Sequence, residues 1–144
     1  NPYSFLVTTL HEFAHLITYN DFGNRIPPHG AAWKMAYTKL LLPVIDSGWL
    51  PAELSNALTH SITRMKASSC TDLQLQRVLL SFNKQDERLV ILETLEKNSI
   101  FALNGRRFQK GLLRRTRYLC TELQSNRQFL VNALAQVERI EHEK

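Results

Sequence analysis

The spacing of apolar residues changes once along the chain, near residue 85. Before that point they recur every three or four positions, as on one face of an α-helix. Residues 2–20 fit a single helix, because Asn1 can cap it, Pro2 suits its first position and Gly23 follows its end. The apolar stripe predicted for the buried side of this helix consists of Phe5, Leu6, Leu10, Phe13, Ala14 and Ile17.

Three more helices are predicted in the first part of the chain. Residues 30–42 follow the Pro27–Pro28 pair and are expected to end at Pro43, because proline cannot donate the next helical hydrogen bond. Weaker helical patterns cover residues 51–65 and 71–82. The apolar positions at helical spacing in the 30–42 segment are Trp33, Ala36, Tyr37 and Leu40.

From Leu89 onward the apolar runs are short and rich in β-branched and aromatic residues, which favours strands. Turn signals such as Asn104–Gly105 and Gln124–Ser125–Asn126 separate them. The runs are RLVIL (88–92), SIFAL (99–103), RYLCTEL (117–123), RQFLV (127–131) and AQVERI (135–140). We therefore expect an α+β fold, with a helical domain over residues 1–85 and a small antiparallel β module over residues 86–144.

The length and composition of the chain exclude several kinds of protein. The chain has 144 residues, of which 44% are hydrophobic, enough to bury a core. It has no apolar run as long as a membrane helix and no secretory signal, so we expect a cytoplasmic protein without a membrane partner. Cys70 and Cys120 show no CxxC pairing, and both are predicted to be packed thiols. Because the chain lacks an initiator methionine and opens close to its first histidine motif, an N-terminal part is expected to be missing.

The sequence HEFAH at residues 11–15 carries the clearest chemistry. His11 and His15 stand one helical turn apart on one face, so both imidazoles can bind one metal ion. Zinc in a hydrolytic site takes three protein ligands and keeps a fourth position for water, and Glu12 would then be the catalytic general base. Uncharged residues flank the motif, as a buried metal helix requires.

Two residues compete to be the third zinc ligand. Asp21 lies six residues after His15, where the metzincin pattern has a ligand, but that pattern requires glycine where this chain has Thr18. His29 follows the Pro27–Pro28 pair and precedes a glycine, so the backbone is fixed before the ligand and freer after it. We favour His29, and interpret Asp21 as a turn or capping residue.

The segments HEFAHL and NDFGNRIPPHGAAWK resemble the SprT-like family of zinc metallopeptidases, in which HExxH is followed after a variable loop by His-Gly-x-x-Trp. The resemblance is close over residues 1–34 and looser over residues 50–140. It implies a helical zincin-type metallopeptidase core with one catalytic zinc ion. The residues to which it assigns roles are His11, His15 and His29 as zinc ligands, Glu12 as the catalytic residue, and Trp33 packed beside the third ligand.

The chain departs from the family pattern in two places. Many SprT-like proteins end in a CxxC…CxxC zinc ribbon, whereas this chain has only two cysteines, so its C-terminal strands are expected to form a degenerate ribbon without metal. The N-terminal helix and strands of the family, which help to form the substrate cleft, have no counterpart in this sequence.

Positive charge is concentrated in the last third of the chain. The net charge is +5, and residues 100–144 contain nine basic and four acidic residues. Cations clustered this closely can bind a phosphate backbone, and aromatic side chains between them can stack on unpaired bases. The alternative is a solvated basic hairpin whose aromatic side chains face the core. The residues concerned are Arg106, Arg107, Lys110, Arg114, Arg115 and Arg117, with Phe108 and Tyr118 between them.

The sequence therefore predicts a zinc-dependent peptidase that acts on protein substrates. Some SprT-like proteins resemble Spartan, which cleaves proteins crosslinked to DNA, and this gives a basic module beside a peptidase site a rationale. The alternative from another class is a nucleic-acid-binding module with a structural or vestigial zinc site. Glu12 argues against this alternative, because a structural site needs no general base.

Overall fold

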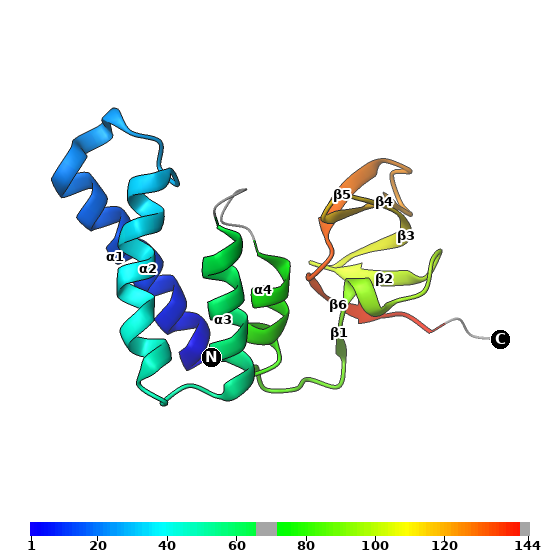
Figure 1. Cartoon of the computed structure of the whole chain (residues 1–144). Coiled ribbons are helices and arrows are strands. Elements are labelled where there is room, and N and C mark those ends of the chain that lie inside the picture. Colours follow the sequence, from blue (N-terminus) through cyan, green and yellow to red (C-terminus); the bar gives the residue numbers. More distant parts are fainter. Residues whose placement is uncertain (66–71, 142–144) are drawn as a thin grey trace. The chain divides into compact units, whose positions relative to one another are not determined.

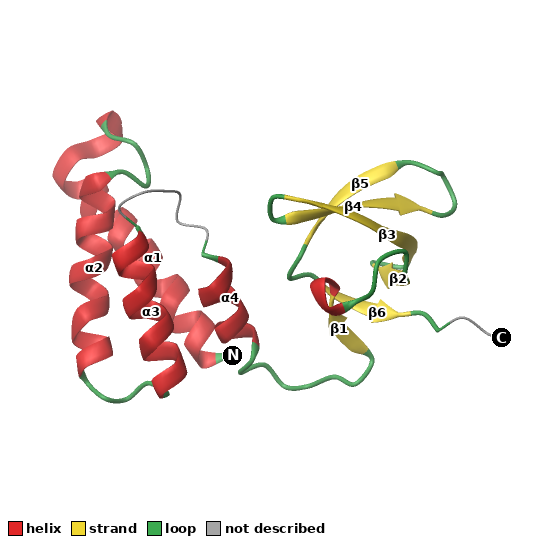
Figure 2. Ribbon diagram, turned by 45° about the vertical axis from the view of Figure 1, so that its right-hand side comes forward, coloured by secondary structure: helices red, strands yellow, loops and turns green. Residues whose placement is uncertain are grey.

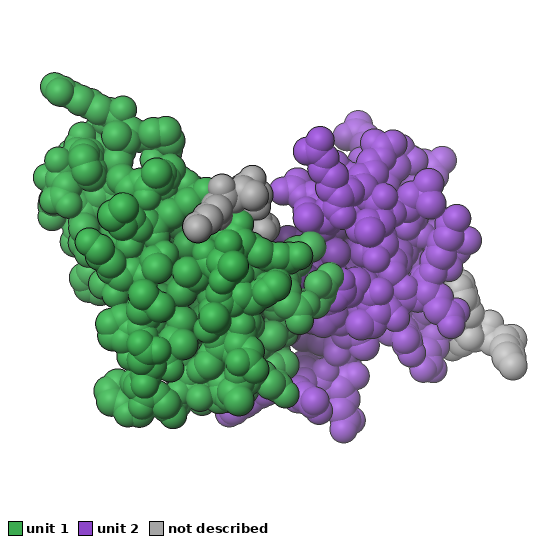
Figure 3. All heavy atoms as spheres, in the orientation of Figure 1, with its two compact units in different colours: residues 1–83 green, residues 84–144 purple. Residues whose placement is uncertain are grey.

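The computed structural model of the chain describes residues 1–65 and 72–141, and it divides into two compact units, residues 1–83 and 84–144 (Figures 1 and 3). The first unit is helical and the second is an antiparallel sheet, so the coarse prediction of an α+β chain is confirmed. Cys70, which the sequence predicts to be a packed thiol, lies outside the described residues. None of the described helices is both long and apolar enough to cross a lipid bilayer.

The first unit packs its helices around one apolar core, and α1 and α2 lie side by side (Figure 2). The Asn1 side chain accepts a hydrogen bond from the Ser4 N–H at 2.9 Å, which confirms it as the cap of the first helix. Gly23 follows the end of that helix with φ 66°, a left-handed conformation that favours glycine. The elements are α1 (Pro2–Phe22), the 3₁₀ turn η1 (Gly23–Arg25), α2 (Ala31–Asp46), α3 (Ala52–Arg64) and α4 (Leu73–Leu80).

Pro43 does not end the second helix, so that prediction is wrong. Helix α2 continues through Pro43 to Asp46. Proline removes the hydrogen bond that would reach the carbonyl of Lys39, but both residues are exposed, so water can satisfy that carbonyl. The additional turn allows Ile45 to pack against the core, which offsets the lost hydrogen bond.

The apolar stripe predicted for α1 is only partly the buried side. The residues that α1 buries are Val7, Ala14 and Thr18. Phe5 is 75% exposed and Phe13 is 50% exposed, so the prediction is wrong for both. Helix α1 carries apolar residues on more than one side, so the periodicity of the sequence does not identify the side that packs against the rest of the unit. The side that packs against α2 is the one next to the histidines.

The second unit is a six-stranded antiparallel sheet in the order β1-β6-β2-β3-β4-β5, with a 3₁₀ turn, η2 (Leu92–Thr94), after the first strand. The five predicted runs all contain strands. A sixth strand, β3, crosses the basic run and was not among them. The strands are β1 (Leu89–Ile91), β2 (Ile100–Leu103), β3 (Arg106–Arg114), β4 (Arg117–Glu122), β5 (Gln128–Asn132) and β6 (Gln136–Arg139).

Short turns fix the register of the sheet. Asn104 and Gly105 both have positive φ, 53° and 76°, and join β2 to β3 as a two-residue hairpin, as the sequence predicts. Cys120 is fully buried in the core of this unit, and burial raises the pKa of its thiol, so its prediction as a packed thiol is confirmed. The other buried residues of this core are Leu92, Leu95, Phe101, Phe108, Val131 and Val137.

A bulge in β3 brings two backbones unusually close together. The register with β4 shifts between Lys110 and Leu113. A Cβ atom added to Gly111 would lie 2.1 Å from the backbone oxygen of Leu119, far inside van der Waals contact. Glycine is therefore required here because of the close approach of β4, and not because of its φ angle.

Gly111→Ala is expected to lower the free energy of unfolding by about 3 kcal/mol, near the upper end for overpacked sites, because the obstructing atom belongs to the backbone. Denaturant unfolding followed by circular dichroism measures the effect. The matched control is Gln109→Ala, an exposed position on the same strand, which should change stability by less than about 0.5 kcal/mol. Equal stability of the two variants would contradict this account of the bulge.

Candidate metal centre

Three histidines meet at the surface between α1 and the start of α2. His11 and His15 lie one turn apart on α1, with their Nε2 atoms 3.1 Å apart. The Nε2 atom of His29, from the loop before α2, lies 3.3 Å from that of His11. The potential ligand atoms of all three residues lie within 4.8 Å of one another. The structure thus brings together the three residues that the sequence selects as metal ligands.

The spacing of these nitrogen atoms fits a tetrahedral zinc site. With zinc–nitrogen bonds of about 2.0 to 2.1 Å and tetrahedral angles, two ligand nitrogens are separated by about 3.3 to 3.4 Å. The two Nε2 separations of 3.1 and 3.3 Å are close to this value. Two of the three nitrogen separations therefore suit one tetrahedral zinc ion, and all three potential ligand atoms lie within 4.8 Å of one another.

Hydrogen bonds among the imidazoles explain this convergence less well than a shared metal ion does. The Nε2 atom of His11 faces the Nε2 atoms of both His15 and His29. In a neutral imidazole one ring nitrogen is a donor and the other is an acceptor with one lone pair, so a single nitrogen cannot accept from both neighbours. A cation, in contrast, can use the lone pair of each nitrogen at once.

Burial and neighbouring charge favour the neutral forms of His11 and His29. Burial lowers the pKa of His11, and His15 and then His29 lower it further. The pKa of His29 is also lowered, first by burial and then by His15. Because a histidine must be neutral to bind a metal, these shifts favour metal binding near neutral pH.

A tight turn positions His29. The Gly30 N–H donates a hydrogen bond to the Pro27 carbonyl at 3.1 Å, so residues 27–30 form a β-turn with Pro28 at its second position. Gly30 is also the N-cap residue of α2, with φ −80°, an angle that any residue adopts. The predicted need for a freer backbone after His29 is therefore not what the structure shows. A Cβ atom on Gly30 would instead approach the Pro27 side chain at 3.3 Å.

Trp33 forms the floor beneath the three imidazoles. It is fully buried, and its ring centroid lies 4.8 Å from His11, 5.4 Å from His15 and 4.9 Å from His29. Its indole Nε1 donates to the His11 backbone oxygen at 3.3 Å, and its ring stacks on Tyr37 at 4.8 Å. The structure therefore places Trp33 beside the third histidine, where the family resemblance puts it.

Asp21 does not join the cluster. Helix α1 continues without a break to Phe22, so Asp21 lies in its last turn and is exposed. A position six residues after His15 in a continuous helix points about 120° away from it around the helix axis. Thr18 is buried, and its hydroxyl donates a hydrogen bond to the Ala14 backbone oxygen at 2.7 Å. The helix therefore continues through the position where the metzincin pattern has a glycine.

Glu12 lies next to the histidines and is exposed to solvent. Its charge acts on the imidazoles, because it raises the pKa of both His11 and His29 against the effects of burial. The carboxylate is thus near the position where a metal ion would be held. It is available to accept a proton, since no described residue forms an ion pair with it.

The basic run agrees in part with the alternative of a solvated basic hairpin, because Phe108 faces the core, but Lys110 is not solvated. Lys110 is only 4% exposed, and its Nζ donates to the Leu95 carbonyl and lies 4.2 Å from the centroid of the Tyr118 ring. Phe108 is also 4% exposed and packs in the sheet core. The prediction of nucleic-acid contact is therefore corrected for both residues, because neither side chain is accessible to a phosphate or a base. Tyr118 is half-buried beneath the lysine.

Arg106 is also engaged within the unit. It forms a salt bridge with Glu122, whose side chain is almost buried, and its guanidinium lies 4.8 Å from the centroid of Phe129. Hydrogen bonds from Arg106 and then Ser125 lower the pKa of Glu122. Nothing in the local sequence marks Glu122 as the partner of Arg106. The two residues are 16 positions apart and meet only because β3 pairs with β4.

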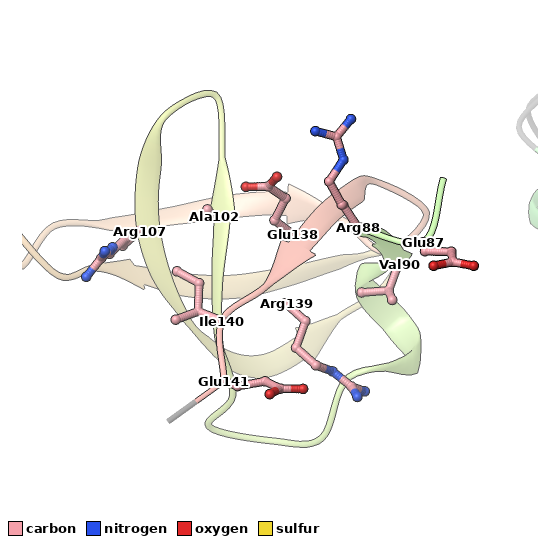
Figure 4. Close-up of a pocket in the computed structure, with 9 residues that line it drawn as sticks. All are labelled: Glu87, Arg88, Val90, Ala102, Arg107, Glu138, Arg139, Ile140 and Glu141. Carbon is pink, nitrogen blue, oxygen red and sulfur yellow. The ribbon is translucent and has the colours of Figure 1, made fainter. Parts of the chain in front are cut away.

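Arg107 faces a pocket of about 570 Å³ in the second unit (Figure 4). Charges of both signs surround this pocket, so it does not present the uniform positive charge of a phosphate site. Arg88 is paired with Asp86 at 3.1 Å. The residues that line the pocket are Glu87, Arg88, Val90, Ala102, Arg107, Glu138, Arg139, Ile140 and Glu141.

All five predicted arginines are exposed, and three of them, Arg114, Arg115 and Arg117, lie together at the end of the β3–β4 hairpin. Comparison of the chain with protein-family models, with curated proteins and with solved structures finds no match. The proposed function therefore rests on the geometry of the three histidines and on the surface of the sheet in the second unit.

Proposed function

We propose that the chain is a zinc-dependent metallopeptidase of the SprT-like type, with His11, His15 and His29 as the zinc ligands. The observation that carries the proposal is the convergence of three imidazoles, with the Nε2 atom of His11 at separations from those of His15 and His29 that suit tetrahedral zinc. Three neutral nitrogen ligands favour zinc over magnesium or calcium, which prefer oxygen.

Glu12 completes the chemistry of a peptidase. Zinc, when bound, lowers the pKa of a water molecule to about 7 and polarises a carbonyl group. The Glu12 carboxylate accepts the proton of the attacking water and passes it to the amine that leaves. Trp33 excludes water from the inner side of the imidazoles and fixes the backbone of His11.

The position of the centre favours a protein substrate. Glu12 and His29 are exposed, and His11 and His15 are half-buried at the surface of the unit. A carboxylate and an open metal position that both face solvent can be reached by a polypeptide segment. A site for a small molecule would instead enclose most of its ligand.

The alternative remains a nucleic-acid-binding module with a structural or vestigial zinc site. The exposed arginines 114, 115 and 117 support it, and the proposal that substrates are associated with DNA depends on the same residues. The burial of Phe108 removes one of the two aromatic residues that would stack on bases. An exposed carboxylate beside three metal ligands has no role in a structural site, which favours the peptidase.

Digestion of casein by the purified chain tests the proposal. Cleavage is expected to stop after treatment with EDTA and to return on addition of zinc but not of magnesium. Persistence of the same cleavage after metal removal would show that it comes from another activity. Absence of cleavage of both casein and histones by fully zinc-loaded protein would overturn the peptidase assignment.

A further inference from the structure

The end of the β3–β4 hairpin and the adjoining strand β5 form a surface that the metal centre does not use. We call this the hairpin surface and define it as Leu112, Arg114, Arg117, Leu119 and Leu130. In the sheet, Arg114 pairs with Arg117 and Leu119 pairs with Leu130. Because residues alternate between the two sides of a strand, these four side chains lie on the side away from Cys120 and Val131, which are in the core.

Apolar side chains are exposed on this surface. Leu130 is 48% exposed, and Leu112, at the bulge opposite Leu119, is 63% exposed. Leu113, on the other side of the hairpin, is 53% exposed. Leu112 and Leu130 are therefore the exposed leucines of the hairpin surface, and exposed apolar side chains rimmed by charge are typical of a protein-binding surface.

The arginines beside these leucines lack acidic partners within the described part of the chain. The described ion pairs of the sheet unit are Arg106 with Glu122 and Arg88 with Asp86, and neither involves the hairpin surface. Arg114, Arg115 and Arg117 therefore present an uncompensated positive charge next to apolar side chains. An acidic partner would complement both their sign and their position.

Strand β5 also offers backbone groups for pairing. It is the last strand in the sheet order, so one of its edges has no neighbouring strand in the described sheet. The Ala133 N–H donates to the Thr116 carbonyl, on the β4 side. Since backbone groups alternate between the two edges of a strand, the N–H and C=O of Leu130 point to the open edge. Neither lysine nor proline protects this edge, and Leu130 lies at its centre.

We propose that the hairpin surface binds an acidic protein segment that pairs with the open edge of β5 as an added strand, packs apolar side chains against Leu130 and directs acidic side chains toward Arg117 and Arg114. The extended backbone supplies affinity, and alternating side chains supply specificity. This inference does not depend on the metal centre.

Other occupants fit the surface less well. A nucleic acid would match the arginines but would leave the leucines without a partner, and Phe108 and Tyr118 are not free to stack on bases. A second copy of the chain would place one set of arginines against another, which costs energy. The combination of arginine, leucine and an open strand edge therefore favours an acidic polypeptide.

Fluorescence anisotropy with a labelled peptide of about ten residues, in which glutamate alternates with leucine or valine, tests the proposal on the full chain. The control peptides carry lysine in place of glutamate, or N-methyl groups on alternate residues that prevent strand pairing. Single- and double-stranded DNA oligonucleotides are titrated in parallel. Only the acidic, unmethylated peptide is expected to bind, with an affinity that falls as salt is raised.

Variants locate the binding to the hairpin surface. The double variant Arg114→Glu/Arg117→Glu and the single variant Leu130→Asp are each expected to weaken peptide binding by about tenfold or more. The controls are Arg107→Glu, in the mixed-charge pocket, and Leu42→Asp, an exposed leucine on α2, which should bind as the parent does. The double arginine variant provides the test if Leu130→Asp lowers the unfolding temperature.

Four results would overturn the proposal. These are equal binding of the acidic and basic peptides, unchanged binding by the variants, tighter binding of DNA in competition with the peptide, and self-association of the chain through the same residues. The third would identify a nucleic-acid surface, and the fourth an interface between copies.

Discussion

Glu12→Gln is expected to reduce peptide-bond cleavage by about 10²- to 10⁴-fold, the usual contribution of a general base, while zinc remains bound. Glutamine keeps the shape of the side chain but cannot accept a proton from the attacking water. The metal is retained because Glu12 is not among the converging ligands. Rates of casein digestion and the zinc content of the same preparations measure both effects.

The matched control for this variant is Glu53→Gln, which changes another exposed glutamate near the start of a helix in the same unit. It is expected to keep full activity. If Glu12→Gln cleaved as fast as the parent chain, Glu12 would not be the base. If it lost its zinc, the loss of cleavage would report on the metal and not on proton transfer.

Removal of either His15 or His29 is expected to abolish stoichiometric zinc binding. Each supplies one of three nitrogens at the centre, so His15→Ala and His29→Ala leave two ligands, too few for a stable zinc site. Equilibrium dialysis with a competing chelator should show a fall in zinc affinity of about 100-fold or more. His60→Ala, at an exposed position on α3, is the control and should bind zinc as the parent does.

Asp21→Ala distinguishes the two candidates for the third ligand. Because Asp21 lies in the last turn of a continuous helix, its loss should leave zinc affinity unchanged. Full zinc binding by His29→Ala together with a loss in Asp21→Ala would reverse the assignment and require α1 to break before its end.

Local signals in the sequence were sufficient to predict that His11, His15 and His29 lie together. The i and i+4 spacing of His11 and His15 depends only on helical geometry, and Asn1 caps the helix as predicted. The approach of His29 depends on a four-residue turn whose prolines restrict the backbone. Each of these features is determined by residues close together in the chain.

Features that depend on contacts between distant segments were predicted less well. Lys110 looks like a surface cation in a basic run, but its aliphatic stem is long enough to bring its ammonium group to the Leu95 carbonyl, 15 residues earlier. Phe5 and Phe13 belong to an apolar stripe, yet another side of α1 packs against α2. In both cases the local pattern is compatible with two arrangements, and packing against distant segments determines which one forms.

X-ray absorption spectroscopy at the zinc edge of the purified, zinc-loaded chain tests the central claim most directly. The account predicts one zinc ion per chain, bound by three imidazole nitrogens at about 2.0 to 2.1 Å and by one further light atom. His60→Ala should give the same spectrum as the parent, whereas His29→Ala should retain too little zinc to give the histidine multiple-scattering signal. A sulfur ligand at about 2.3 Å, or a zinc shell without imidazole, would contradict the assignment of the metal centre to His11, His15 and His29.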